Sequence, residues 1–187
     1  MVAWVPANYG DLNLAEVAAE AGYTRGALYH LFDDKEDLAL AAVAWVWETW
    51  QEQVASPADS HDEPFQALVA LARGHIAYCR DGRARVMMTL RVEFAEREHP
   101  VGDAVWKIAA ALRRRVERLV VRGRRAGTIS PGPPARVVAA AYLSALEGLA
   151  IGVAGRTPHD EALAERVVLG LLRGGPLPLG RSGDRVG

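Results

Sequence analysis

Apolar residues recur at three- and four-residue intervals along most of the 187-residue chain, and no stretch shows the alternation of a half-buried strand. The pattern predicts an all-α protein with short connections. Residues 55–64, ASPADSHDEP, have the composition of a loop. The expected helices cover about residues 13–21, 24–32, 34–54, 64–80, 83–98, 101–126, 134–154 and 159–173.

Capping residues mark the ends of the first three expected helices. Asn13 is placed to cap the first helix, with Glu16 completing a capping box, and Gly22 stops that helix as a C-cap glycine. Thr24 and Asp34 are placed to cap the second and third helices. Two short helices joined by a glycine turn predict a helix-turn-helix, whose second helix enters the major groove of DNA.

The second short helix carries side chains suited to DNA. A guanidinium at its start, on Arg25, suits bidentate contact with guanine, and Gly26 allows close approach of the backbone. The hydroxyl of Tyr29 and the imidazole of His30, one turn later, suit phosphate oxygens. The ammonium of Lys35, beside the free amides of the next helix, suits them as well. The expected DNA-binding residues are Thr24, Arg25, Gly26, Ala27, Tyr29, His30 and Lys35.

The segment LAEVAAEAGYTRGALYHLFDDKEDL resembles the DNA-binding segment of the tetracycline-repressor-like (TetR) transcriptional regulators. The resemblance is specific over about residues 11–38. It implies an N-terminal helix-turn-helix followed by a helical-bundle regulatory domain. It further implies a cytoplasmic homodimer that binds double-stranded operator DNA and a small-molecule effector, most simply as a repressor. The residues that carry the pattern are Ala21, Gly22, Thr24, Gly26, Leu28, Tyr29, Phe32, Lys35 and Leu38.

Three departures from the family pattern bear on DNA binding. Members begin with an additional helix, which Pro6 disfavours here, so we expect the first helix to be absent or truncated by the start position. Ala27 replaces a residue that often carries a hydroxyl, and suits contact with a thymine methyl instead. Residues 1–60 contain two basic and ten acidic residues, a net charge of −8, whereas the remainder carries +7. The alternative function is therefore a ligand-binding dimer that binds DNA poorly.

A ligand pocket is the second expected site. Three tryptophans crowd the helix that leaves the helix-turn-helix, and flexible methionines follow beside further aromatic residues. Ordinary core packing explains these residues as well, and a lone His75 is more typical of a satisfied core histidine than of a ligand-binding one. The candidate pocket residues are Trp47, Trp50, Phe65, Leu68, His75, Met87, Met88, Phe94, Trp106 and Tyr142.

The last two expected helices predict a dimer interface. Residues 137–154 form a mostly apolar run near the minimum length for a membrane span, but its small residues and Glu147 favour a buried helix at a packed interface. Whether Glu147 faces the pocket or the partner stays open. Two such helices from each chain would form a four-helix bundle. The candidate interface residues are Tyr142, Gly148, Gly152, Leu163, Val167 and Leu171.

Enzymatic motifs are missing from the sequence, which has no GxSxG, phosphate-cradling glycine loop or HExxH. A single cysteine, Cys79, rules out an internal disulfide and a cysteine metal cluster. We therefore expect no catalysis, no cofactor and no metal. The arginine-rich face of 101–126 is interpreted as solvated, with a second nucleic-acid patch as the alternative. The expected division is a DNA-binding domain over 1–45, a regulatory domain over 46–173 and a disordered tail over 174–187.

Overall fold

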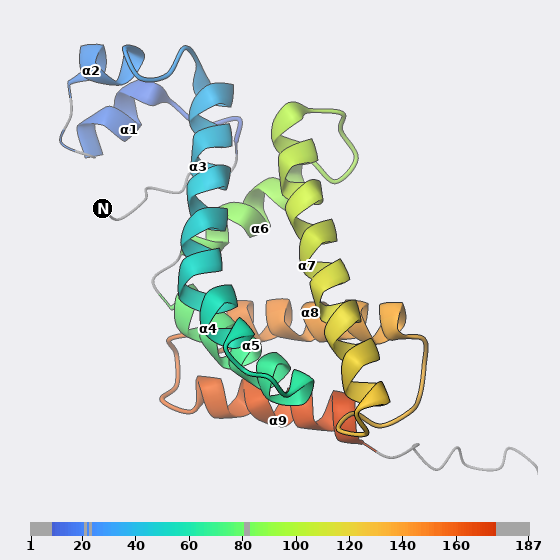
Figure 1. Ribbon diagram of the computed structural model, residues 1–187. Helices are drawn as coiled ribbons and strands as arrows, with labels where there is room; N and C mark the ends of the chain where they lie inside the picture. The colour runs from blue at the N-terminus through green and yellow to red at the C-terminus, as the bar shows by residue number, and fades with distance from the viewer. Residues whose placement is uncertain (1–8, 21, 23, 81–82, 175–187) are drawn as a thin grey trace, which may run out of the picture.

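The computed structural model describes residues 9–20, 22, 24–80 and 83–174, which form helices joined by turns (Figure 1). No strand occurs in this part of the chain, so the predicted all-α class is confirmed. The expected absence of a first helix and the expected disordered tail after residue 174 lie outside the described residues. The helical elements are α1 (Leu14–Glu20), α2 (Arg25–Tyr29), α3 (Lys35–Trp50), the π-helical turn η1 (Gln51–Ala55), α4 (Ser56–Asp59), α5 (Pro64–Cys79), α6 (Arg83–Glu93), α7 (Pro100–Arg125), α8 (Ala135–Gly152) and α9 (Asp160–Arg173).

Helices α1 and α2 form a helix-turn-helix unit at one end of the molecule (Figure 1). Asn13 caps α1, because its Oδ1 accepts a hydrogen bond from the amide two residues on at 2.9 Å. Gly22 has a φ of +74°, the left-handed conformation of a C-cap glycine, as the sequence predicted. The unit is held together by a small apolar cluster of Leu14, Ala18 and Leu28.

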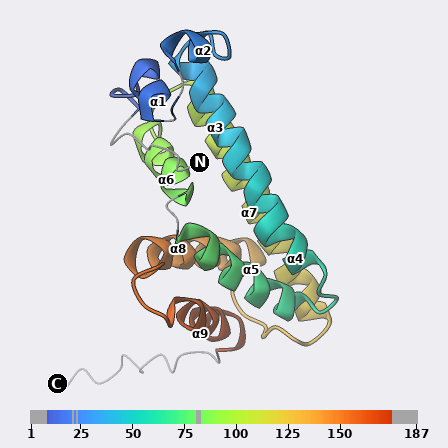
Figure 2. The ribbon, with the colours of Figure 1, turned by 90° about the vertical axis from the view of Figure 1, so that its left-hand side faces the viewer.

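Helix α3 runs from the helix-turn-helix unit to the opposite end of the molecule (Figure 2). Composition predicted a loop from residue 55, but the helical path continues beyond this residue. The π-helical turn η1 continues it, and α4 extends the helical path to Asp59. The polar residues there are compatible with helix because Val54, Ala55 and Ala58 are buried against α5.

The main core surrounds α5, which packs against α7, α8 and α9. Leu68, Ala72 and Ile76, spaced by four residues along α5, are fully buried at its centre. The residues of α9 that face this core, Ala164, Val168 and Leu172, follow the same spacing. Helices α5, α7, α8 and α9 therefore bury one continuous apolar core.

A second cluster joins the start of α3 to α6 and α7. Its buried members are Tyr9, Ala39, Val43, Leu90, Phe94, Val101 and Val105. Polar contacts surround it: His99 Nε2 lies 3.4 Å from Glu36 Oε2, and the backbone amide of Tyr9 donates to Glu93. Through this cluster the N-terminal end of α3 packs against α6 and α7.

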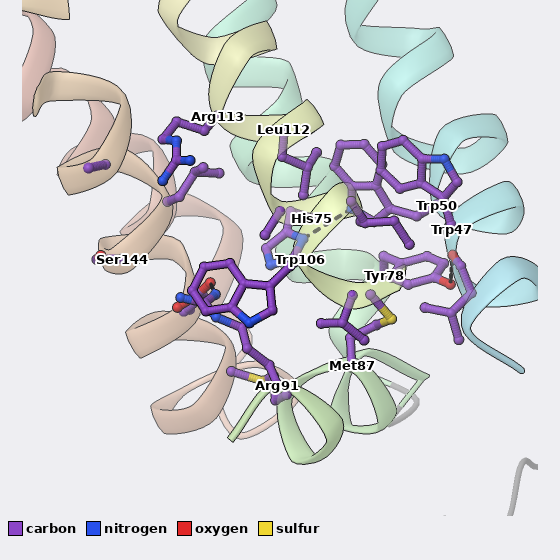
Figure 3. A pocket seen from close by; sticks show the side chains of 18 residues that line it. Trp47, Trp50, His75, Tyr78, Met87, Arg91, Trp106, Leu112, Arg113 and Ser144 are labelled. Carbon is purple, nitrogen blue, oxygen red and sulfur yellow. Dashed lines mark hydrogen bonds and ion pairs between the residues drawn. The ribbon is translucent and has the colours of Figure 1, made fainter. Parts of the chain in front are cut away.

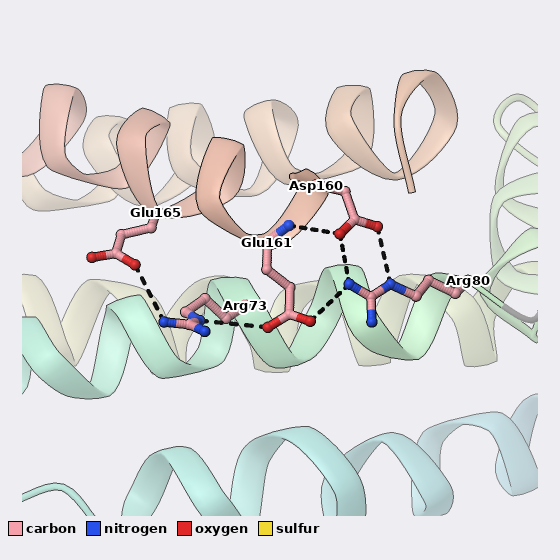
Figure 4. A network of polar contacts seen from close by, with 5 residues as sticks. All are labelled: Arg73, Arg80, Asp160, Glu161 and Glu165. Carbon is pink, nitrogen blue, oxygen red and sulfur yellow. Dashed lines mark hydrogen bonds and ion pairs between the residues drawn. The ribbon is translucent and has the colours of Figure 1, made fainter. Parts of the chain in front are cut away.

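A network of ion pairs joins α5 to the start of α9 (Figure 4). Arg80 donates from Nε to Asp160 Oδ2 at 3.0 Å and from Nη2 to Asp160 Oδ1 at 2.6 Å. Asp160 is fully buried and also accepts from the amide of Gly155 at 2.9 Å. The Arg80 guanidinium therefore holds the pKa of the Asp160 carboxyl well below its usual range. Arg73, about two turns before Arg80 along the chain, pairs with Glu161 and Glu165.

Helix α8 is long and apolar enough to cross a membrane by length and composition, but only by those criteria. Its inner face packs in the bundle through Val138, Ala139, Tyr142 and Leu146. Only 22% of its 18-residue apolar window is buried within the chain, and the expected burial at a packed interface stays a prediction.

Candidate DNA-binding unit and ligand pocket

The predicted cap of α2 is present. Thr24 Oγ1 accepts a hydrogen bond from the amide of Ala27 at 3.2 Å, and Thr24 itself is exposed with extended backbone. The same hydroxyl that caps the helix therefore remains on the surface, where the sequence analysis placed a phosphate contact.

The other expected DNA contacts share the outer face of α2. Gly26, Tyr29 and His30 are exposed, and Tyr29 has 46% of its surface accessible. A Cβ atom added to Gly26 would meet nothing within 4 Å, so the backbone there is open to a neighbouring molecule. Ala27 is half-buried, and the side chain of Arg25 lies outside the described residues.

The surroundings of Lys35 differ from the expectation. Its Nζ lies 4.7 Å above the centre of the Tyr9 ring, in a cation–π contact. The amides at the start of α3 are not free either, because Asp34 Oδ1 accepts from Glu36 N at 2.8 Å and from Asp37 N at 2.9 Å. The acidic cap that the sequence predicted thus satisfies two of the amides expected to be free, and the phosphate contact of Lys35 stays a prediction.

A cavity of about 200 Å³ lies in the other half of the molecule (Figure 3). Its walls come from α3, α5, α6, α7 and α8, and most of its lining is apolar. Trp106 stands at its edge with 45% of its surface exposed. The lining residues are Val46, Trp47, Trp50, His75, Tyr78, Met87, Met88, Arg91, Val105, Trp106, Ile108, Ala109, Leu112, Arg113, Ala140, Leu143, Ser144 and Glu147.

Two tryptophans of α3 form one wall of this cavity. Trp47 and Trp50 stack with ring centroids 5.4 Å apart and an interplanar angle of 8°. Trp50 Nε1 donates to His75 Nδ1 at 3.1 Å across to α5 (Figure 3). Burial lowers the pKa of His75 to about 4, so its ring is neutral near pH 7.

Six of the ten expected pocket residues line the cavity: Trp47, Trp50, His75, Met87, Met88 and Trp106. The expectation for the other four is corrected, because they do not line this cavity and are buried in the apolar clusters. Phe65 and Leu68 belong to the main core, and Phe94 belongs to the second cluster. Tyr142 is fully buried, and its hydroxyl donates to the carbonyl of Leu68 at 2.7 Å.

Several lining residues escaped the sequence analysis. Arg91 of α6 and Glu147 of α8 form an ion pair, so Glu147 faces the pocket. The two residues are far apart in the chain, so no local pattern predicts that they pair. Glu147 was noticed only as the lone acid in an apolar helix. Tyr78 and Leu112 lie on helices with ordinary amphipathic patterns, which do not distinguish core from cavity wall.

The expected interface residues are mostly on the surface of α8 and α9. A Cβ atom added to Gly148 or Gly152 would meet nothing within 4 Å. Leu163 and Leu171 are each 38% exposed, and Val167 between them is half-buried. Tyr142 is corrected here too, because its fully buried side chain cannot reach a partner.

The capped helix-turn-helix and the separate pocketed bundle define a DNA-binding transcriptional regulator. The sequence profile of the bacterial regulatory proteins of the tetR family matches residues 7–42. The match covers the helix-turn-helix unit, so this part of the chain is similar to the DNA-binding unit of tetR-family regulators.

Solved structures share this fold at low sequence identity. A putative fatty acid metabolism regulator of Clostridium perfringens superposes with a TM-score of 0.75 and 17% identity, over 92% of this chain and 93% of that one. FadR of Bacillus subtilis, in complex with stearoyl-CoA, gives 0.72 and 15% over 89% and 90%. AibR, in complex with isovaleryl coenzyme A and operator DNA, gives 0.68 and 22% over 89% of each chain. No curated protein sequence matches the chain.

Proposed function

We propose that this regulator is a ligand-responsive repressor of the cytoplasm, which releases operator DNA when a small, largely apolar molecule enters the pocket. The observation that carries the proposal is the course of α3. Its first residues adjoin the helix-turn-helix unit, and its last turns supply Val46, Trp47 and Trp50 to the cavity wall. A ligand that displaces these side chains acts on the same rigid element that positions α2.

The pocket favours apolar ligands of modest size. Its volume of about 200 Å³ is below the usual range of ligand pockets, so a larger effector would have to extend through the edge beside Trp106. Acyl thioesters are the candidate class, because AibR and FadR, which share the fold, were solved with isovaleryl coenzyme A and stearoyl-CoA. The apolar lining suits an acyl chain.

Operator binding by Thr24, Arg25, Gly26, Ala27, Tyr29, His30 and Lys35 is tested by fluorescence anisotropy with DNA from upstream of the gene. Octanoyl-CoA should release the DNA, and free coenzyme A should not. The matched variant is Trp50→Ala, which should retain DNA binding but lose release. DNA binding that ignores every acyl-CoA while the thioesters bind the protein would contradict the coupling through α3.

A second candidate function is a ligand-binding dimer with little affinity for DNA. It is favoured by the acidic N-terminal part, where Lys35 rests on Tyr9 and Asp34 occupies the amides of α3. Few cations there would displace counterions from DNA. Anisotropy on the chain with and without an N-terminal basic helix distinguishes the candidates: binding only by the extended form supports the second.

We also propose that two copies pair through α8 and α9. The exposed apolar residues Val137, Ile151, Leu163 and Leu171 lie on these helices, and small residues between them allow close helix contact. Gly148→Leu tests this, because a side chain there meets nothing within the protomer. Light scattering should report monomers, whereas Gln66→Leu, on exposed α5 surface, should leave the dimer intact. An unchanged Gly148→Leu dimer would place the interface elsewhere.

A further inference from the structure

The imidazole of His75 faces the cavity rather than bulk solvent. The side chain keeps some accessible surface and lines the cavity, yet burial lowers its pKa to about 4. Both observations hold if the accessible edge of the ring opens only onto the enclosed space. His75 is therefore a neutral polar group set in a mostly apolar wall.

The hydrogen bond from Trp50 fixes which ring nitrogen carries the proton. An indole N–H can only donate, so His75 Nδ1, 3.1 Å away, must accept. In a neutral imidazole the proton then resides on Nε2. That nitrogen lies 3.6 Å from Cys79 Sγ, and sulfur is a weak acceptor. The ring thus presents an N–H donor with a weak partner, and it cannot serve as a base toward the thiol.

The other hydroxyl groups and the charged groups of the lining are committed elsewhere or stand toward solvent. The Tyr78 hydroxyl donates to the carbonyl of Val46 at 3.0 Å and contacts Thr49 Oγ1 at 2.7 Å. Arg91 and Glu147 neutralise each other. Arg113 and Ser144 are exposed.

We infer that His75 Nε2–H recognises a neutral hydrogen-bond acceptor, the carbonyl oxygen of a ketone, ester, thioester or amide, within an otherwise apolar effector. The inference rests on the proposed function, in which this cavity holds the effector. A carbonyl oxygen would replace the weak sulfur contact with a strong one. A carboxylate would bring an unpaired charge against a neutral ring, which desolvation disfavours. Trp50 belongs to α3, the helix that follows α2. The imidazole that would bind the carbonyl, that of His75, therefore accepts a hydrogen bond from a side chain of this helix.

The test is a cycle of two probes and two proteins. The probes are methyl hexyl ketone and the alkene in which a methylene group replaces the ketone oxygen, and calorimetry gives their affinities. In His75→Leu the ketone should weaken about tenfold more than the alkene, because only the ketone loses a buried hydrogen bond. His75→Gln, which keeps a donor, should recover part of this difference. Trp47→Phe, the matched change on the same wall, should affect both probes alike.

The outcomes separate this inference from the proposed function. Equal losses of both probes in a folded His75→Leu variant would overturn the inference and leave the pocket as a ligand site. If that variant does not fold, nitrogen NMR of the intact protein decides: the ketone should shift the Nε2–H resonance far more than the alkene. Similar shifts with both bound probes would overturn the inference. If octanoate binds more tightly than the ketone and Arg113→Ala loses this binding, the polar end of the ligand lies at Arg113 and the inference is overturned. Failure of both probes to bind would overturn the inference together with the proposed pocket function.

Discussion

The two ends of this molecule are stabilised in different ways. The helix-turn-helix unit has a cluster of three small or medium apolar side chains, and its helices of seven and five residues depend on local caps. The other end buries residues from α5, α7, α8 and α9 in one core. Short helices are marginal without packing. We conclude that the DNA-binding end has low local stability and the pocketed end carries most of the free energy of folding.

The largest expected effect comes from a pair of leucine substitutions, one at each end of the molecule, which test whether the two ends differ in stability. Leu68→Ala, at a fully buried position, should lower the free energy of unfolding by about 2–5 kcal/mol through lost burial and a cavity. Leu28→Ala should instead abolish DNA binding while the urea transition seen by tryptophan fluorescence barely moves, because four of the five tryptophans, Trp45, Trp47, Trp50 and Trp106, lie outside the helix-turn-helix unit. Equal shifts in both variants would mean that the two ends unfold as one unit.

A smaller effect concerns pH at the pocketed end. The pKa of His75 is about 4 in the folded protein against about 6.5 unfolded, so the unfolded chain binds more protons between these values. Stability is therefore fully present above about pH 6.5 and is lost as the pH falls toward about 4. Urea unfolding should show a decrease of about 2 kcal/mol between about pH 7.5 and about pH 5.

The control for this pH effect is His75→Gln, which removes the titrating ring but leaves the remaining histidines in place. Its stability should fall less over the same interval. A variant with the same pH slope as the unaltered chain would assign the effect to other groups.

The smallest effect sharpens the description of the DNA-binding end. Thr24→Ala removes the oxygen that accepts from Ala27 N, and loss of such a cap costs about 1 kcal/mol. We expect weaker DNA binding with an unchanged tryptophan transition. Thr24→Ser, which keeps the hydroxyl, should bind DNA like the original chain. If both substitutions weaken binding equally, the methyl group of Thr24 matters and the cap does not.

The sequence predicted the helix-turn-helix in detail because its signals are local. Asn13, Gly22 and Thr24 act on backbone within a few residues, so their types and spacing suffice. The pocket was predicted only in part. Periodicity indicates which helix face is buried, but it does not tell whether that face meets another side chain, as Leu68 does, or a cavity, as Met87 does. Contacts such as Arg91 with Glu147 depend on how distant helices pack, which no local pattern encodes.

The π-helical turn after α3 has a consequence for insertions and deletions in this chain. Val46, Trp50, Val54 and Ala58 are all buried, although steps of four residues drift steadily around an ordinary α-helix. The wider turn of η1 takes up that drift, so this helical path contains one residue more than a regular helix needs. Deleting a single exposed residue at Glu52 would leave steps of four, three and four, the spacing of a regular amphipathic helix. Loss of one residue in this place should therefore preserve the buried face, whereas the same loss within α5 would turn half of its core side chains toward solvent.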